Sequence, residues 1–193
     1  IETEKDDHTK LVRVSHRTTD LLKVTQVNRV SREITEGKLS TNAAYELLQE
    51  IEAAPIGFSL KMQLLAASLA SACFVIMFNG SWIDFLPALL TGGLGFLSFL
   101  AINSLVSIKF VSEFLSAVVI GLVSFFFIQL GFGYEIDKII IGSVMPLVPG
   151  LLITNAVRDL MAGHLVSSLS KGAEAFLTAL AIGGGIAIVF TIL

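Results

Sequence analysis

Apolar and polar residues follow two different patterns along the chain. Over residues 19–54 apolar residues recur every three to five positions with charged residues between them, which predicts two amphipathic helices. Gly37 is expected to follow the end of the first helix, and Ser40 to cap the second. The chain beyond them consists of long, almost uninterrupted apolar runs. The pattern therefore predicts a small polar head, residues 1–56, followed by a transmembrane domain, residues 57–193.

The second part contains five apolar segments long enough to cross a bilayer, for which roughly 20 apolar residues are needed. They lie near residues 60–78, 85–108, 110–130, 139–154 and 176–193. The expected fold is an all-α polytopic membrane protein with about five transmembrane helices. The head is expected to be helical, or α/β if residues 11–14 form a short strand. Three successive glycines, at 183–185, predict either a flexible point or a very close helix contact.

Composition supports this division. Hydrophobic residues make up 54% of the 193 residues and charged residues 15%, whereas soluble domains have about 25% charged residues. Charged residues occupy 18 of the first 54 positions but only 11 of the other 139. There is no basic stripe, so a nucleic-acid partner is not expected. The chain starts at Ile1 with a polar, acidic stretch unlike a signal peptide, and we expect an N-terminal piece to be missing.

The distribution of basic residues predicts the orientation in the membrane. With the head inside, the inner segments contain twelve Lys and Arg residues and the outer segments only Lys138. Basic residues are retained on the cytoplasmic side of membrane proteins. We therefore expect a multi-pass protein with a cytoplasmic N-terminus and an outer C-terminus.

The fourth apolar segment holds the first candidates for a transport site. Pro146, Pro149 and Gly150 lie within five residues, and proline inside a helix removes a backbone hydrogen bond and clashes with the preceding turn. Broken backbone at membrane depth is tolerated where protein or a water-filled cavity surrounds it, and transporters build midplane sites from such broken helices. A packing kink or the end of a short span is the simpler alternative. We predict a break that forms a substrate site.

Charged and polar residues near the spans are the second set of candidates. Arg158 offers two parallel donors to a carboxylate, but it fits an inner-leaflet anchor equally well. Asp159 can pair with Arg158 or carry a proton, and Asn155 lies one turn earlier on the same helix face. Lys109 and Glu113, four residues apart, are expected to form a structural ion pair at the inner boundary.

Glu174 is expected to open the last span, where a carboxylate suits the helix dipole or serves in a proton relay. Motifs of enzymes are missing from the sequence: it has no HExxH, no GxSxG and no Walker loop. Its single cysteine, Cys73, forms no CxxC pair. The sequence therefore predicts no catalytic residue and no metal, cofactor or nucleotide site.

The order of these motifs resembles a known family. The stretches LVRVSHRTTDLLKVTQVNRVSREITEGKLSTNAAYELLQEIE and MPLVPGLLITNAVRDLMAGHLVSSLSKGAEAFLTALAIGGGIAI are similar to the threonine/serine exporter family of bacteria, and most closely to its smaller split-type members. The most specific part is Pro149-Gly150 followed by Asn155, Arg158-Asp159 and Gly163. An upstream GxExxRVE stretch typical of the family does not occur in this sequence.

The resemblance implies a secondary transporter of the bacterial inner membrane that exports small carboxylate metabolites, either threonine and serine or a dicarboxylate such as succinate. It also implies a partner within the lipid bilayer, either a second small polytopic membrane protein or further copies of this chain. In this hypothesis the broken helix opens to form the site and Arg158 binds the substrate carboxylate. Asp159, Glu113 or Glu174 then handles protons or holds Arg158 in place.

Two other classes of function stay open. One is a non-transporting membrane scaffold whose cytoplasmic head recruits a partner, and it predicts that substitutions at the proline-rich break are tolerated. The other is an intramembrane enzyme, which the missing nucleophile and metal motifs make the least favoured.

Overall fold

The structure is a computed structural model that describes residues 20–54, 57–106, 108 and 110–192. Every regular element in these ranges is helical, and the strand considered at residues 11–14 lies outside them. The chain divides into two compact units, Ile1–Phe58 and Ser59–Leu193. We call them the head and the membrane unit and describe each by itself.

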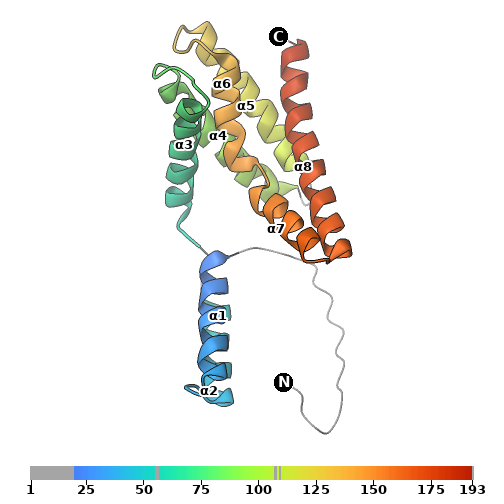
Figure 1. Ribbon diagram of the computed structural model, residues 1–193. Coiled ribbons are helices and arrows are strands. Elements are labelled where there is room, and N and C mark those ends of the chain that lie inside the picture. Colours follow the sequence, from blue (N-terminus) through green and yellow to red (C-terminus); the bar gives the residue numbers. More distant parts are fainter. Residues whose placement is uncertain (1–19, 55–56, 107, 109, 193) are drawn as a thin grey trace. The chain divides into compact units, whose positions relative to one another are not determined.

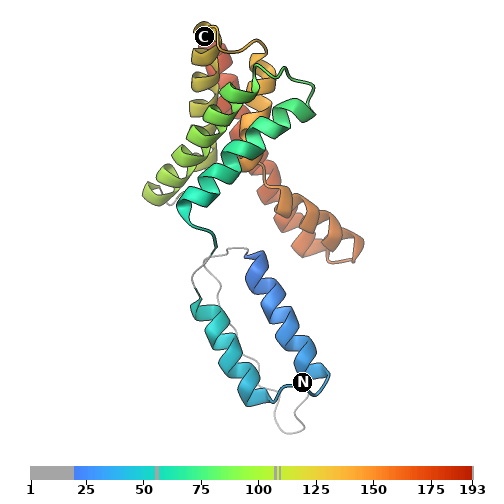
Figure 2. The same ribbon diagram turned by 90° about the vertical axis from the view of Figure 1, so that its left-hand side faces the viewer.

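The head contains two helices, α1 (Leu21–Thr35) and α2 (Thr41–Ala53), which lie side by side in Figure 2. Gly37 follows α1 with a φ of +71°, a left-handed conformation that glycine adopts without a Cβ clash. The Ser40 hydroxyl accepts a hydrogen bond from the backbone N–H of Ala43 at 3.4 Å and caps α2. Both helix-boundary predictions are confirmed.

The described head buries little apolar surface. Its fully buried side chains are Val30 of α1 and Ala44 of α2. Leu21, Leu22 and Val27 of α1 are exposed, although the helical pattern placed Leu22 and Val27 on the apolar face. Two short helices alone are marginally stable, so this exposed face is available to pack on a further surface.

The membrane unit contains six α-helices within the described ranges. They are α3 (Leu60–Met77), α4 (Phe85–Leu105), α5 (Val111–Gln129), α6 (Ile136–Val144), α7 (Gly150–Met161) and α8 (Leu165–Ile192), and the 3-10 turn η1 (Met145–Leu147) follows α6 (Figure 1). Four of them, α3, α4, α5 and α8, are long and apolar enough to cross a membrane. The bent pair of α6–η1 and α7 makes a fifth span if it is counted as one. The predicted all-α polytopic membrane fold is confirmed.

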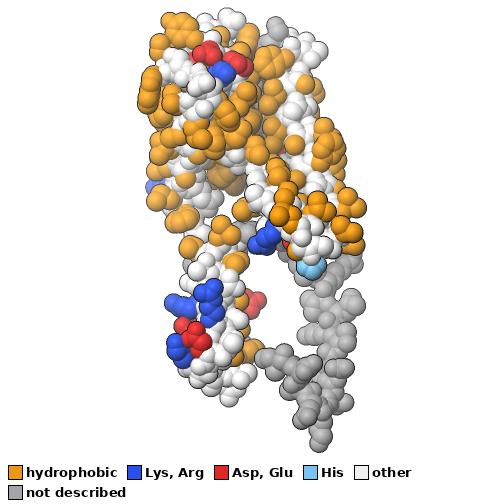
Figure 3. All heavy atoms as spheres, in the orientation of Figure 1, with side chains coloured by type: hydrophobic (Ala, Val, Ile, Leu, Met, Phe, Trp, Pro, Cys, Tyr) orange, Lys and Arg blue, Asp and Glu red, His pale blue; other side chains and the backbone are white. Residues whose placement is uncertain are grey.

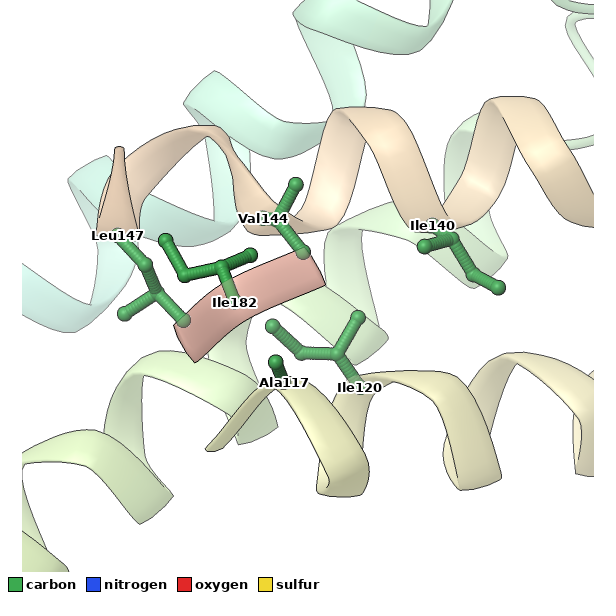
Figure 4. Close-up of a cluster of buried hydrophobic side chains, with 6 residues drawn as sticks. All are labelled: Ala117, Ile120, Ile140, Val144, Leu147 and Ile182. Carbon is green, nitrogen blue, oxygen red and sulfur yellow. The ribbon is translucent and has the colours of Figure 1, made fainter. Parts of the chain in front are cut away.

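Small residues allow the helices of the membrane unit to approach closely. Gly185 of α8 lies against the backbone of Phe114 in α5, and α8 continues without interruption through residues 183–185. Of the two interpretations of the three glycines, the close contact is therefore confirmed. A cluster of buried side chains joins α5, α6–η1 and α8 (Figure 4); it consists of Ala117, Ile120, Ile140, Val144, Leu147 and Ile182. In Figure 3 hydrophobic side chains cover most of the visible face of the membrane unit.

The last helix starts earlier than the sequence suggested. α8 begins at Leu165 rather than near Phe176, because Gly163, with a φ of +81°, ends α7 and the chain turns directly into the next helix. The first turns of α8 are rich in serine, which lowers the local hydropathy and hides them from a search for apolar runs. Glu174 consequently lies in the third turn of α8, and the prediction that it opens this helix is wrong.

Candidate functional site

The proline-rich segment breaks the helix as the sequence predicted. Pro146 lies inside η1, and Val148 and Pro149 separate η1 from α7. The two helical parts differ in direction by 65°. The N–H of Gly150 donates to the carbonyl of Val148 at 2.8 Å, and the N–H of Ile153 donates to the carbonyl of Pro149 at 3.1 Å. The break is therefore a hydrogen-bonded turn, from which α7 starts as a separate helix.

The start of α7 is suited to an anion. No side chain caps this helix, whose first residue is Gly150. The first N–H groups of a helix have no partner within it, and the helix dipole places partial positive charge at this end. Transporters with broken helices direct such N-termini at anionic substrate groups. A Cβ at Gly150 would meet nothing within 4 Å, so the backbone here is also accessible from outside the unit.

One face of α7 is polar and exposed. Gly150, Thr154 and Arg158 recur every four residues and so lie on one side of the helix, and all three are exposed. The Thr154 hydroxyl donates to the carbonyl of Gly150 at 3.1 Å. Arg158 has no ion pair within the part of the chain that the structure describes. Its guanidinium is therefore available to an external carboxylate.

The helix N-terminus and Arg158 are two separate positions. Eight residues separate Gly150 from Arg158, which corresponds to about 12 Å along an α-helix. A single carboxylate is much smaller than this spacing and contacts only one of the two at a time. The sequence hypothesis placed Pro146, Pro149, Gly150 and Arg158 in one site. In the structure Pro146 lies in η1 and Pro149 precedes α7, whereas Gly150 and Arg158 lie about two turns apart on α7.

Asp159 connects α7 to α8. One of its oxygens, Oδ2, accepts a hydrogen bond from the Ser167 hydroxyl at 2.6 Å and one from the Lys171 ammonium at 2.6 Å. The backbone carbonyl of Asp159 also accepts from the N–H of His164 at 2.8 Å. Asp159 thus pairs with Lys171 and not with Arg158, which was the pairing considered from the sequence. Asn155, one turn earlier, is half-buried on the same side of α7.

Sequence reasoning missed Ser167 and Lys171 as partners of Asp159. They lie 8 and 12 residues further along the chain and meet it only because α8 runs back along α7 after Gly163. Figure 2 shows this hairpin leaving the other helices of the membrane unit together. The available signal was the Gly163-His164 turn, which would have placed the two helices antiparallel.

A groove of about 610 Å³ lies between α7 and the first half of α8. Its walls are mostly apolar, with Leu160 of α7 and Leu169 and Phe176 of α8 among them. The Ser168 hydroxyl, which also lines the groove, donates to the carbonyl of Ala156 at 2.8 Å and is satisfied. Without a free polar group among these residues, the groove suits an apolar surface rather than a charged metabolite.

The remaining predicted site residues lie elsewhere in the membrane unit. Glu113 lies half-buried in the first turn of α5, but Lys109 is outside the described residues, so their ion pair stays a prediction. Glu174 is half-buried in α8, and its backbone carbonyl accepts from the Thr178 hydroxyl at 3.0 Å. The described ranges contain no group of three or more His, Cys, Asp or Glu residues able to hold a metal ion.

Comparison with known proteins assigns the chain to a family. The model of the family described as "Putative threonine/serine exporter" matches residues 1–193. The Threonine/serine exporter of Corynebacterium glutamicum is 26% identical over 167 residues, which is 82% of this chain. The chain spans about a third of that relative, since the matched part is 33% of its length. No solved structure matches the chain. The match over its whole length shows that this chain, a multi-pass membrane protein, belongs to the threonine/serine exporter family.

Proposed function

We propose that this chain is part of a secondary transporter that exports small carboxylate metabolites across a bacterial inner membrane, and that α7 contacts the substrate. The observation that carries this proposal is the exposed polar face of Gly150, Thr154 and Arg158, which begins at an uncapped helix N-terminus. Family membership supports export as the class of activity. The chain spans about a third of that relative, and in this proposal further membrane helices, from another protein or another copy, complete the transporter.

The two anion-binding positions on α7 suggest the order of substrate contacts. Arg158 captures the carboxylate from the cytoplasmic side, and the N-terminus of α7 at Gly150 receives it about 12 Å deeper. Both positions recognise a carboxylate, so threonine, serine and a dicarboxylate such as succinate all fit. The name of the Corynebacterium relative favours threonine and serine. Asp159 and Lys171 neutralise each other and hold α7 against α8, so among the described residues Arg158 has no carboxylate partner.

A partner supplies the opposite wall of the site in this proposal. Near the α7–α8 turn, Met161, Val166 and Leu169 are 85%, 86% and 75% exposed. Lipid or a second membrane protein can cover such side chains, but the polar face of α7 requires a protein surface or water. A second small polytopic membrane protein is the first candidate partner, and a second copy of this chain is the alternative.

Efflux from cells that lack their own exporters tests the proposal. The full-length gene is expressed with and without the gene of a second small membrane protein encoded beside it, and cells are loaded with threonine, serine or succinate. We expect efflux of one of these substrates, dependent on Arg158. If membrane insertion is verified and none of them leaves the cell, the scaffold function takes the place of the exporter.

Arg158 variants separate a binding role from an assembly role. Arg158→Ala should abolish efflux while the amount and size of the membrane complex stay unchanged, and Arg158→Lys should restore it only in part because an ammonium lacks the planar pair of donors. The matched control is Lys61→Ala, which removes one exposed cation from the first turn of α3 and should leave efflux intact. Loss of the complex in Arg158→Ala would assign this residue a structural role instead.

A further inference from the structure

A buried carboxylate lies at the opposite end of the membrane unit from the α7–α8 turn. Asp84 directly precedes α4 and is 0% exposed. Its Oδ1 accepts hydrogen bonds from the backbone N–H groups of Tyr134 at 2.7 Å and Glu135 at 3.4 Å, which ties the α5–α6 connection to the start of α4. Its other oxygen, Oδ2, is buried and has no hydrogen-bond partner within the described residues. Anchoring the connection accounts for Oδ1 but not for Oδ2.

A layer of buried hydroxyl groups lies deeper in the same bundle. Four of its members, from α3, α4, α5 and α6, are 0–1% exposed: Ser71, Thr91, Ser124 and Ser143. In its first turns α5 also buries Ser112 and Ser116, and the Ser112 hydroxyl has no partner within the described residues. Two of the four are satisfied, because Ser71 donates to the carbonyl of Ala67 at 2.9 Å and Ser143 donates to that of Ala88 at 3.4 Å. The hydroxyls of Thr91 and Ser124 have no partner among the residues described.

Close glycine contacts place these four hydroxyls at a similar depth. Gly92 of α4 lies against the side chain of Ser71, and a Cβ there would be 3.7 Å from the Cα of Ser143. Gly95 of α4 lies against Ile120 of the antiparallel α5. Thr91 lies one helical turn before Gly95, and Ser124 lies one turn after Ile120. Because the two helices are antiparallel, Thr91 and Ser124 are level with each other. Their unpartnered hydroxyls therefore face the same contact between α4 and α5.

Unpartnered buried oxygens of this kind require an explanation. A buried polar atom that loses its hydrogen bond to water costs about 1–3 kcal/mol, and more if it is charged. A carboxylate that is buried in protein is expensive unless it is paired or protonated. Carboxylate and hydroxyl oxygens offer lone pairs, and hard oxygen ligands suit a proton or a hard metal cation. A proton or a hard metal cation would satisfy Asp84 Oδ2.

We propose that Asp84 is the binding group for a monovalent cation, a proton or a sodium ion, that moves during the transport cycle. The hydroxyls of Thr91 and Ser124 form a second polar position for the cation. Seven residues separate Thr91 from Asp84, which corresponds to about 10 Å along α4. The cation therefore visits the two positions in turn. This inference rests on the proposed function, to which it adds the coupling site.

Other charged and titratable groups lie near Asp84. They are Tyr134 and Glu135 in the α5–α6 connection, and Asp137 and Lys138 in the first turn of α6. Lys138 lies 3.9 Å from the Asp137 carboxylate. In the half of α3 that is nearer Asp84, the titratable side chain is that of Cys73, which is exposed. In the described structure none of these side chains is hydrogen-bonded to the free oxygen of Asp84.

The chain carries its own reporter for this site. Trp82 is its single tryptophan and lies two residues before Asp84, and its ring lies 6.0 Å from that of Phe85 at an interplanar angle of 33°. Fluorescence of the purified full chain is titrated with protons at constant sodium and with sodium at constant pH. We expect a saturable change with one of the two cations, and its loss in Asp84→Asn. Asn keeps an oxygen that can accept the Tyr134 and Glu135 N–H bonds, so the connection stays anchored while the charge is removed.

The matched control is Asp137→Asn, which removes a carboxylate from the same end of the unit at a side chain that is 62% exposed. It should keep the cation-dependent change. If neither cation changes the fluorescence, or if Asp84→Asn responds as the wild type does, the proposal is wrong. Because this titration requires no transport, it is informative even where the efflux experiment fails, so the failures of the two proposals are distinguishable.

Transport measurements add a second, independent test where efflux is found. Asp84→Asn should lose transport driven by an imposed gradient of the identified cation while exchange of internal for external substrate continues. Thr91→Val and Ser124→Ala remove unpartnered hydroxyls, which should leave the resistance to unfolding equal to or above that of the wild type. We expect both variants to slow gradient-driven transport several-fold. Wild-type coupling in all three variants would overturn the proposal.

Discussion

The contact between α5 and α8 gives the sharpest stability prediction. A Cβ added at Gly185 would overlap the carbonyl oxygen of Phe114 and lie 3.0 Å from the Cβ of Ala117. The first of these atoms belongs to the backbone of α5, so the contact can be relieved only if one helix shifts. A Cβ added at Gly183, two residues earlier in α8, would meet nothing within 4 Å.

Gly183→Ala and Gly185→Ala therefore form a matched pair. Both substitutions gain the same helix propensity, about 1 kcal/mol of alanine over glycine. Only Gly185→Ala forces extra volume into a closed contact, which costs about 1–3 kcal/mol. We expect Gly183→Ala to be as stable as the wild type or more so, and Gly185→Ala to be less stable than Gly183→Ala by about 1–3 kcal/mol.

The difference can be measured by following the loss of helical circular dichroism as SDS is titrated into the purified chain in lipid–detergent micelles. The comparison between the two variants cancels changes that are common to both, including the helix propensity of the denatured chain in SDS. Equal stability of the two variants would refute the close approach of α8 to the backbone of α5 and with it the packing described for this end of the core.

Three further outcomes are expected. Asp159→Asn and Lys171→Met should each lower the thermal stability of the α7–α8 hairpin, and the double variant should be no less stable than the worse single variant, because each removes the same ion pair. Pro149→Ala should permit a more continuous helix and so reduce the 65° bend, which spin-label distances between α6 and α7 would detect, and it should impair efflux. After the native cysteine is replaced by serine, a membrane-impermeant maleimide should label Tyr134→Cys in intact cells but label His164→Cys only after permeabilisation. The reverse labelling would invert the proposed orientation.

The parts of the fold that follow from local chemistry could be predicted from the sequence. Long apolar runs require helices in a membrane, since each backbone N–H and C=O must be satisfied within the segment. The break at Pro149 follows from the geometry of proline itself, and the positive φ of Gly37 from the low cost of that conformation for glycine. Each of these predictions depends on a few neighbouring residues, which is the range over which sequence patterns are informative.

The interactions across helices could not be predicted in the same way. The Asp159–Lys171 pair depends on how α8 folds back after Gly163, and its alternative, Arg158, is adjacent in sequence but points along a different face of α7. Nothing in the sequence around Asp84 indicates that it is buried, yet the α5–α6 connection folds over it and buries it completely. The start of α8 was expected too late in the sequence for a similar reason. Its first serines lower the local hydropathy, but they face α7 rather than lipid.

The short helix α6 links the two proposed sites. Its N-terminal connection is held by Asp84 through the N–H groups of Tyr134 and Glu135, and its other end continues through η1 into the break at Pro149. Its 9 residues span about 13 Å, and Ile139, Ile140 and Val144 are buried against neighbouring helices. A helix packed in this way moves as a unit rather than bending, so a change in the charge of Asp84 shifts the start of α7 if it shifts α6 at all.

Linkage is reciprocal: a carboxylate bound at the N-terminus of α7 must then change the cation affinity of Asp84 by the same factor by which the cation changes the affinity for the carboxylate. In this proposal the cation site and the substrate site influence each other through the position of α6, without direct contact between the two ligands.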